Sequence, residues 1–182
     1  MEGRAAALGA GTVLNALATG TGAAFGIDVE TRATVELDPA ADGVAGEIAE
    51  DPDADTDLIE RCVSLATDRW GDGEGGTVRT DSDVPLAAGL KSSSAAANAT
   101  VLATCDALGL VVGDGGRASG DAVGDDGRAS DDAVGDGGRA SDDAVGDDPD
   151  DPAVDVTRLE ACRLGVRAAR EVGVTVTGAF DD

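Results

Sequence analysis

The stretch from residue 85 to residue 95 reads Pro85-Leu86-Ala87-Ala88-Gly89-Leu90-Lys91-Ser92-Ser93-Ser94-Ala95 and decides how this chain is interpreted. It places a glycine, the single lysine of the protein and a run of serines directly before an apolar helical pattern. Free N–H groups and the positive end of the helix dipole make such a helix start an anion site. Serine hydroxyls can bond phosphate oxygens or Mg²⁺, and Lys91 adds a positive charge. The stretch therefore predicts a phosphate-binding loop.

The same stretch also allows a purely structural interpretation. Residues 92–94 can cap the helix, and Gly89 can simply turn the chain. The pattern is not a Walker A loop, because that motif needs a glycine directly before the lysine and this chain has Leu90 there. The sequence thus disfavours a P-loop kinase and leaves phosphate binding and helix capping as alternatives.

Strand and helix patterns lie on both sides of the loop. Residues 77–83 read as a short strand that leads into it, and residues 94–110 read as the helix that follows, with small and apolar side chains on one face. Strand, glycine-containing loop and helix therefore follow one another along the chain.

The upstream part contains a strand and a helix. Residues 31–37 alternate apolar and polar side chains, which predicts a half-buried strand. Residues 39–54 are rich in Asp, Gly and Pro and read mostly as loop. Apolar residues then recur at helical spacing over residues 56–70, which predicts an amphipathic helix with Thr56 as its N-cap and Gly71 at its end.

A low-complexity segment interrupts the downstream part. Between residues 113 and 152 the chain repeats Gly-Arg-Ala-Ser and Ala-Val-Gly-Asp with a period of eleven. Each unit has too little apolar surface to offset the entropy of ordering, so we expect a disordered acidic insertion. After it, residues 155–171 read as a helix with Asp155 as N-cap and Gly173 at its end, and residues 174–177 read as a strand.

Composition limits the possible partners. The formal charge is −24, which makes nucleic acid and acidic membranes improbable partners and favours a small-molecule ligand. Asp predominates over Glu, and Arg over Lys, a bias that resembles proteins of salt-loving microbes. The hydrophobic residues, 42% of the chain, are mostly Ala and Val, so we expect one domain with a core of small side chains.

The residue types that are scarce limit the possible chemistry. The chain has no histidine, which excludes Ser-His-Asp triads and histidine-containing zinc sites. Cys62, Cys105 and Cys162 have no CxxC spacing and lie in apolar helical patterns, so we expect buried free thiols. We recognise no signal peptide or membrane span and expect a cytoplasmic protein.

Residues 85–95 resemble the Pro-x-x-x-Gly-Leu-x-Ser-Ser-Ser/Ala motif of the GHMP superfamily, which includes galactokinase, homoserine kinase, mevalonate kinase and the archaeal shikimate kinases. The lysine-bearing form of the motif is most similar to the archaeal shikimate kinase branch. Residues 9–16 together with 22–28, and residues 177–182, are similar to the same branch.

The resemblance implies an α+β fold in the ribosomal protein S5 domain 2-like arrangement, a mixed or antiparallel sheet backed by helices. Residues 1–112 would form the first part of a GHMP N-terminal domain with the ATP loop, and residues 153–182 would continue it after the insertion 113–152. Family members extend into a second, C-terminal domain. The sequence contains no counterpart of this domain, so we expect a truncated chain.

The resemblance also implies the reaction: transfer of the ATP γ-phosphoryl group to the 3-hydroxyl of shikimate, with Mg²⁺. Residues 85–95 would wrap the ATP phosphates. By motif and spacing, Asp181 or Asp182 would be the catalytic base, and Ser93 with Glu171, or less favourably Glu160, would bind the metal. An arginine should meet the shikimate carboxylate, and Arg4, Arg32 and Arg79 are the candidates.

Other functions stay open at this point. Another GHMP acceptor, such as homoserine or mevalonate, is the nearest alternative. The chain could instead be an ATP-binding fragment without turnover, or a salt-adapted interaction protein whose acidic repeat binds a partner. The glycine-rich residues 9–15 and 20–26 lie where family members line the substrate site, although tight turns explain them equally well. The sequence predicts no oligomeric state.

Overall fold

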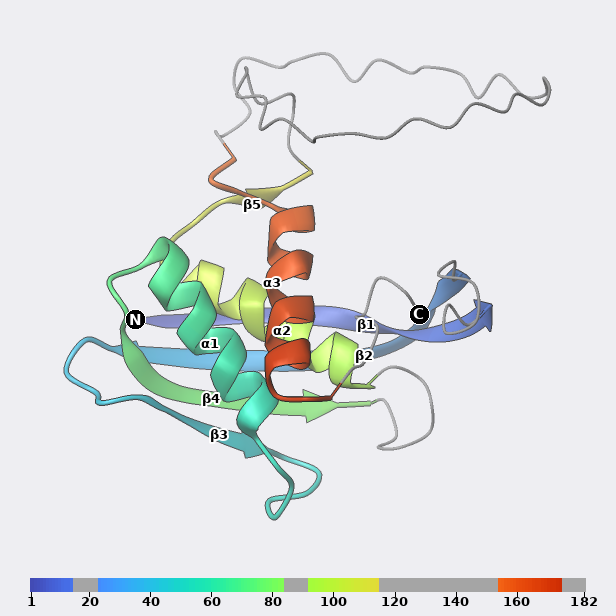
Figure 1. The fold of residues 1–182 in the computed structure, drawn as a ribbon, viewed down its shortest axis with the longest axis horizontal. Coiled ribbons are helices and arrows are strands. Elements are labelled where there is room, and N and C mark those ends of the chain that lie inside the picture. The colour runs from blue at the N-terminus through green and yellow to red at the C-terminus, as the bar shows by residue number, and fades with distance from the viewer. Residues whose placement is uncertain (15–22, 84–91, 115–153, 175–182) are drawn as a thin grey trace.

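A mixed sheet forms the base of the computed structural model, which describes residues 1–14, 23–83, 92–114 and 154–174 (Figure 1). Its strands lie in the order β1-β2-β4-β3, where neighbours are hydrogen-bonded. The pairs β1–β2 and β2–β4 are antiparallel, and β3 runs parallel to β4. The α+β fold with a mixed sheet backed by helices is therefore confirmed. The strand bounds are β1 Glu2–Leu14, β2 Ala23–Asp38, β3 Val44–Ile48 and β4 Gly75–Ser82.

The half-buried strand predicted from the alternation in residues 31–37 is confirmed, and it is longer than predicted. Ala33, Val35 and Leu37 are at most 3% exposed, and the residues between them face the other side of the sheet. The described glycine-rich residues 9–14 and 23–26 lie in strands β1 and β2, and the residues between them lie outside the described part of the chain.

Strand β3 was not predicted, since residues 39–54 read mostly as loop. Val44 and Ile48 are only half-buried, because β3 is the edge strand beside β4. Its central residue, Gly46, donates its N–H to Glu60 Oε1 at 2.8 Å. A short, half-exposed edge strand with a glycine at its centre has a weak sequence pattern.

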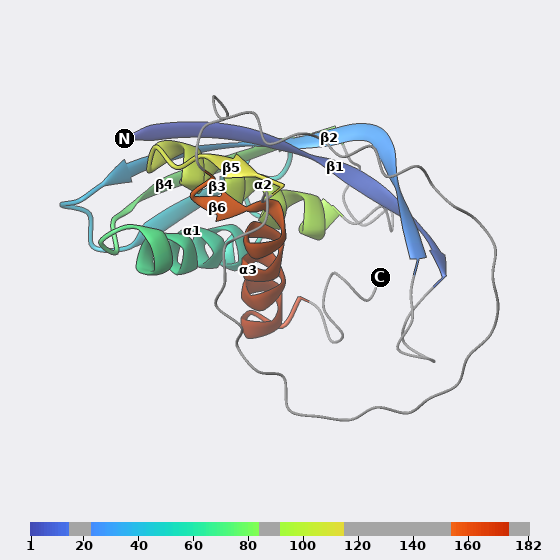
Figure 2. The same ribbon diagram turned by 90° about the horizontal axis from the view of Figure 1, so that it is seen from above.

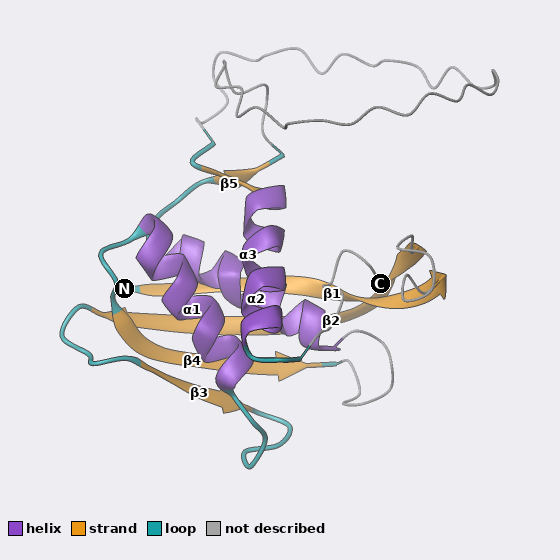
Figure 3. Cartoon of the chain, viewed as in Figure 1, coloured by secondary structure: helices purple, strands orange, loops and turns teal. Residues whose placement is uncertain are grey.

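All helices of the described residues lie on one face of the sheet (Figures 2 and 3). Helix α2 packs on β1 and β2, helix α1 packs on β3 and β4, and helix α3 packs on α1 and α2. One apolar cluster therefore lies between the sheet and the first two helices, and a second lies between the helices. None of the described helices is long and apolar enough to cross a membrane. The bounds are α1 Asp57–Trp70, α2 Ser92–Ala107 and α3 Arg158–Glu171.

Helix α1 begins after Thr56, as predicted, but the Thr56 hydroxyl does not cap it. This hydroxyl donates to Glu60 Oε1 at 2.7 Å. The carboxylate of Asp55 instead accepts from the N–H of Asp57 at 2.8 Å. Gly71 closes the helix in an extended conformation.

Asp155 was predicted as the N-cap of helix α3, but the helix begins two residues later. Thr157 is the N-cap, in a capping box with Glu160. The carboxylate of Asp155 accepts instead from the N–H of Val111 at 2.9 Å. This bond lies beside a short parallel pair of strands, β5 Val112–Gly113 and β6 Val156–Thr157. The predicted helix end is confirmed, because Gly173 has a φ of 77°.

The cysteines are free, as predicted. Cys62 and Cys105 are buried and Cys162 is half-buried. Burial raises the pKa of the Cys62 thiol to about 12 and that of Cys105 to about 11. These thiols are protonated at neutral pH, which makes them packing groups and not nucleophiles.

Helix α2 holds an unpaired polar group in the core. Thr100 and Thr104 are both 0% exposed. Thr104 donates its hydroxyl to the carbonyl oxygen of Thr100 at 2.8 Å, whereas Thr100 Oγ1 has no hydrogen-bond partner among the described residues. A buried hydroxyl without a partner costs free energy.

Replacing Thr100 with valine is therefore expected to raise the free energy of unfolding by about 1 kcal/mol, because the shape is kept and the unpaired hydroxyl is removed. The matched variant Thr104→Val loses a formed bond and is expected to be destabilised by about 1 kcal/mol. Urea unfolding in molar salt measures both. Equal destabilisation by the two variants would contradict the prediction.

Candidate functional site

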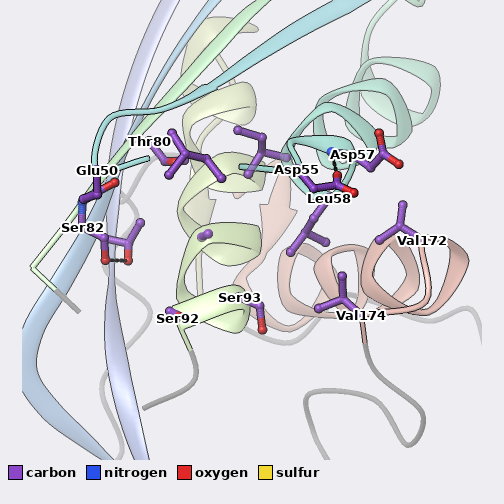
Figure 4. Close-up of a pocket in the computed structure, with 14 residues that line it drawn as sticks. Glu50, Asp55, Asp57, Leu58, Thr80, Ser82, Ser92, Ser93, Val172 and Val174 are labelled. Atoms are coloured by element: carbon purple, nitrogen blue, oxygen red, sulfur yellow. Dashed lines mark hydrogen bonds between the residues drawn. The ribbon is translucent and has the colours of Figure 1, made fainter. Parts of the chain in front are cut away.

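A cavity of about 260 Å³ opens between the helices and the ends of the strands (Figure 4). The first turns of α1 and α2, the ends of β3 and β4, and the segment after α3 surround it. Apolar side chains form most of its wall, together with hydroxyl and carboxylate groups, and a mostly apolar cavity is typical of small-molecule sites. The apolar lining residues are Ile48, Leu58, Ile59, Ala96, Val172 and Val174.

Ser92 and Ser93 line the cavity from the first turn of α2 (Figure 4). This turn contains no acidic residue, so nothing within the helix neutralises the positive end of its dipole. Ser94 follows and is half-buried, whereas Ala95 is 1% exposed and packs in the core. The predicted anion site therefore opens onto a cavity at Ser92 and Ser93, and Ala95 supports the helix from inside.

A hydrogen-bonded group fixes the end of β4, from which the chain runs into the predicted loop. The hydroxyls of Thr31 and Ser82 lie 2.7 Å apart. The N–H of Ser82 donates to the carboxylate of Glu50, and the N–H of Asp83 donates to the carbonyl oxygen of Glu30 at 2.9 Å. Thr31, Glu50 and Ser82 all line the cavity. This wall is thus tied to β2 and to the segment after β3.

The charged side chains that line the cavity are carboxylates. Glu50, Asp55 and Asp57 stand at its exposed rim, and among the described lining residues none carries a positive charge. Figure 4 shows Glu50 and Asp55 away from Ser92 and Ser93. The cavity therefore has two electrostatic ends, a helix start that favours an anion and an acidic rim that repels one.

Glu171 lies at the end of α3, directly before the cavity residue Val172. Arg167 Nε donates to Glu171 Oε1 at 2.7 Å, and Arg61 Nε donates to Glu171 Oε2 at 2.6 Å. These arginines hold the pKa of the Glu171 carboxyl below its ordinary value, with the bond from Arg167 as the largest cause. Both oxygens of this candidate metal ligand are thus engaged by guanidinium groups.

Glu160, the second candidate for the metal, caps α3. Its carboxylate accepts from the N–H and the hydroxyl of Thr157 at 3.0 and 2.9 Å. Bonding to the Thr157 backbone is the largest cause that lowers the pKa of Glu160. Its place is at the start of α3, whereas the cavity lies beyond the end of that helix.

The arginines considered for a substrate carboxylate do not line the cavity. Arg32 lies between the buried Thr31 and Ala33, so its side chain points to the face of the sheet without helices. The same alternation places Arg4 and Arg79 on that face. Each pairs with an acidic neighbour: Glu2 for Arg4, Glu30, Asp81 and Asp83 for Arg32, and Glu47 for Arg79.

Several predicted site residues lie outside the described part of the chain. These are residues 85–91 of the loop, Asp181 and Asp182, most of the insertion 113–152 and most of the predicted strand 174–177. Their roles, the role of Glu171 and the domain boundaries stay predictions. Within the described ranges, no group of three or more His, Cys, Asp or Glu side chains could hold a metal ion.

The sequence did not point to the acidic rim or to the hydroxyl wall. Glu50, Asp55 and Thr80 line the cavity but lie outside recognised motifs. They come together only because β3 runs parallel to β4 and α1 follows β3. The alternation of Val44 and Ile48 with smaller or polar residues was the one signal that could have located this wall.

Comparison with known proteins gives matches at the level of domain, sequence and fold. Residues 57–120 match the family described as GHMP kinases N terminal domain. Shikimate kinase from Halobacterium salinarum is 54% identical over all 182 residues of this chain, which span 49% of that protein. Shikimate kinase from Methanosarcina mazei is 47% identical over 182 residues, which span 47% of it.

A solved structure shares the fold. Mevalonate diphosphate decarboxylase from Staphylococcus aureus matches with a TM-score of 0.50 and 18% identity, over 59% of this chain and 36% of that one. The chain thus spans about half the length of the curated relatives it matches, and it shares its fold with more distant enzymes.

Proposed function

We propose that this chain is the ATP-binding half of a shikimate kinase of the GHMP superfamily, and its domain match and its similarity to archaeal shikimate kinases support this. The full-length protein would transfer the γ-phosphoryl group of ATP to the 3-hydroxyl of shikimate. The observation that carries the proposal is the cavity whose wall includes Ser92 and Ser93 at the start of α2.

The two ends of the cavity suggest how ATP would lie. Phosphates would bind at the start of α2, where N–H groups, the helix dipole and the hydroxyls of Ser92 and Ser93 favour negative charge. The base would lie between apolar walls that include Ile48, Leu58 and Ile59. The reverse orientation would place phosphates beside the carboxylates of the acidic rim and is disfavoured.

The remaining loop residues and the end of the chain would supply the chemistry. Residues 85–91 would wrap the phosphates, with Lys91 neutralising negative charge. Asp181 or Asp182 would accept the proton of the attacking hydroxyl. Phosphoryl transfer depends mainly on positioning and on charge neutralisation, so these few groups are enough for the reaction.

A magnesium ion would arrive together with ATP. No group of three or more metal-binding side chains exists in the described ranges, so the chain has no cage of its own there. Mg²⁺ commonly uses one or two protein ligands together with phosphate oxygens and water. Ser93 would supply its hydroxyl and Glu171 its carboxylate, after one of the bonds from Arg61 and Arg167 is exchanged. When bound, the ion would neutralise charge on the phosphates.

A second candidate function follows from the length of the chain. Since these residues span about half of each relative, the chain by itself would bind ATP without phosphorylating shikimate. The acceptors of other GHMP kinases, such as homoserine and mevalonate, are the alternatives for the full-length protein.

The test is ATP-dependent phosphorylation of shikimate in molar salt with Mg²⁺. It compares the chain of 182 residues with a chimera in which the remaining half of the Halobacterium salinarum relative follows residue 182. We expect turnover by the chimera and ATP binding without turnover by the chain alone. Phosphorylation of homoserine or mevalonate in place of shikimate would overturn the substrate, and absence of ATP binding to either protein would overturn the proposed function.

A further inference from the structure

We propose that two helix carboxylates, Asp106 of α2 and Glu60 of α1, close the outer strands of the sheet to strand addition by a second copy of this chain. This role concerns self-association and is independent of the proposed function. Two hydrogen bonds and two glycines support it, in the same arrangement at opposite edges of the sheet.

The sheet has two outer strands, β1 and β3, which lie at its opposite sides (Figure 1). An outer strand has a row of N–H and C=O groups that no neighbouring strand binds, and such a row can pair with a strand of another molecule. Strand β1 is 13 residues long and β3 is five, so β1 has the longer edge. Residues 5–14 of β1 include neither a charged side chain nor a proline, which commonly protect edges.

The pairing of β1 with β2 determines which N–H groups of β1 point away from the sheet. Met1 and Leu37 exchange two hydrogen bonds, each 2.7 Å long. Bonded and non-bonded residues alternate along an antiparallel pair. The outward N–H groups before the first register shift are therefore those of Glu2, Arg4, Ala6 and Leu8.

Asp106 occupies the middle of this outward row. Its Oδ2 accepts the N–H of Arg4 at 2.8 Å. An added strand would lie about 4.8 Å from β1 and would bring a carbonyl oxygen to the place that this carboxylate oxygen holds. The negative charge of Asp106 would also repel the carbonyl oxygens of that strand. Strand addition across residues 2–8 is therefore blocked while this bond is formed.

Glu60 has the same position at the opposite edge. Its Oε1 accepts the N–H of Gly46, the central residue of β3, at 2.8 Å. The same oxygen accepts the hydroxyl of Thr56 at 2.7 Å, which holds the carboxylate beside the strand. Because β3 has only five residues, one carboxylate at its centre is enough to interrupt pairing.

Each carboxylate reaches its strand because a glycine lies at the contact. A Cβ at Gly3 would lie 2.2 Å from backbone atoms of α2, the helix that carries Asp106. A Cβ at Gly46 would lie 2.6 Å from Thr56 Cβ and 3.0 Å from Glu60 Oε1. A residue without a side chain is needed for such a close approach. The two edges thus share one arrangement, a strand glycine beside a helix carboxylate.

Net charge does not replace these contacts in molar salt. Each copy has a formal charge of −24, which repels a second copy at low ionic strength. At 1 M salt the Debye length is about 3 Å, so this repulsion is screened almost to contact distance. Protection of the edges then depends on local groups such as Asp106 and Glu60.

The experiment measures the mass of the 182-residue chain by sedimentation velocity in molar salt, at concentrations of about 10 to 100 µM. We expect the unchanged chain to sediment as one copy throughout. Asp106→Ala should associate, with an average mass that rises about twofold or more with concentration. Glu60→Ala should associate less, because β3 is shorter. The bond to Asp106 is exposed, so water can replace it and the helix signal in circular dichroism should stay unchanged.

Two further variants separate edge pairing from other causes of association. Asp106→Asn removes the same charge as Asp106→Ala but keeps an oxygen that can accept the N–H of Arg4, so it should remain one copy. Adding Ala6→Pro to Asp106→Ala removes an outward N–H of β1, a position where an outer strand tolerates proline. This double variant should return to one copy.

Four results would overturn the inference. The first is a single copy of both Asp106→Ala and Glu60→Ala at every concentration. The second is association of the unchanged chain or of Asp106→Asn as strong as that of Asp106→Ala, which would indicate another surface or a charge effect. The third is association that persists in the double variant, and the fourth is association only with loss of the helix signal. None of these results depends on nucleotide binding, so the proposed function is tested separately.

Discussion

Replacing Gly3 with alanine is expected to lower the free energy of unfolding by about 3 kcal/mol, at the upper end of the range for overpacking. A Cβ at Gly3 would lie 2.2 Å from the carbonyl oxygen of Ala103 and 2.2 Å from the amide nitrogen of Ala107. Both atoms belong to the backbone of α2, so no side chain can rotate away. Either the helix or strand β1 must move.

The measurement is urea or thermal unfolding of the chain in molar salt, where we expect the melting temperature to fall by roughly 10 °C. Gly26→Ala is the matched control, because it is the same change in the neighbouring strand β2. There the added Cβ has only an ordinary contact, 3.8 Å from Leu8 Cδ1. If Gly3→Ala has the same melting temperature as Gly26→Ala and the unchanged chain, helix α2 does not approach β1 as closely as described.

The small side chains of this protein explain why helix α2 lies so close to strand β1. Alanine residues of α2 at positions 99, 103 and 107 face the sheet, where Gly3 lets the two backbones meet. A core of this kind depends on short distances between elements more than on large side chains. Composition predicted it, because the chain has two Phe, one Trp and no Tyr.

Much of the fold could be predicted from periodicity. The helix of residues 56–70 and the strand of residues 31–37 have a clear buried face, and both are observed. Strand β3 and the start of α3 could not be predicted, for different reasons. The edge strand is only half-buried, so its apolar pattern is weak. Aspartate is a favourable N-cap residue, but the carboxylate of Asp155 accepts a hydrogen bond from the N–H of Val111 and does not cap α3. Such tertiary competition has no local sequence signal.

The candidate site likewise has a part that the sequence predicts and a part that it does not. Local chemistry and resemblance predict a phosphate loop at residues 85–95, and the last residues of this stretch do start a helix beside a cavity. The cavity wall formed by Thr31, Glu50 and Ser82 comes from segments that lie about 20 to 30 residues apart in the sequence, so no motif contains it. Sheet order, and not spacing along the chain, brings these residues together.

Replacing Lys91 with alanine is expected to weaken ATP binding by about 10- to 100-fold, because a charge-assisted bond to phosphate is worth about 1.5–3 kcal/mol and 1.4 kcal/mol is a factor of ten. Lys91 is the single lysine of the chain and directly precedes α2. Titration of ATP and of adenosine into the chain, in molar salt with Mg²⁺, measures the effect. Adenosine has no phosphate, so its affinity should stay unchanged.

The variants around Lys91 decide between phosphate binding and helix capping for the serine run. Lys91→Arg keeps the charge and should retain most of the ATP affinity, whereas Ser93→Ala should weaken ATP binding with little effect on adenosine. If ATP binding survives in Lys91→Ala and Ser93→Ala while Ser93→Ala lowers the melting temperature, the serines are caps and the phosphate site lies elsewhere. Equal losses for ATP and adenosine would instead indicate damage to the cavity itself, since a phosphate contact cannot act on a ligand without phosphate.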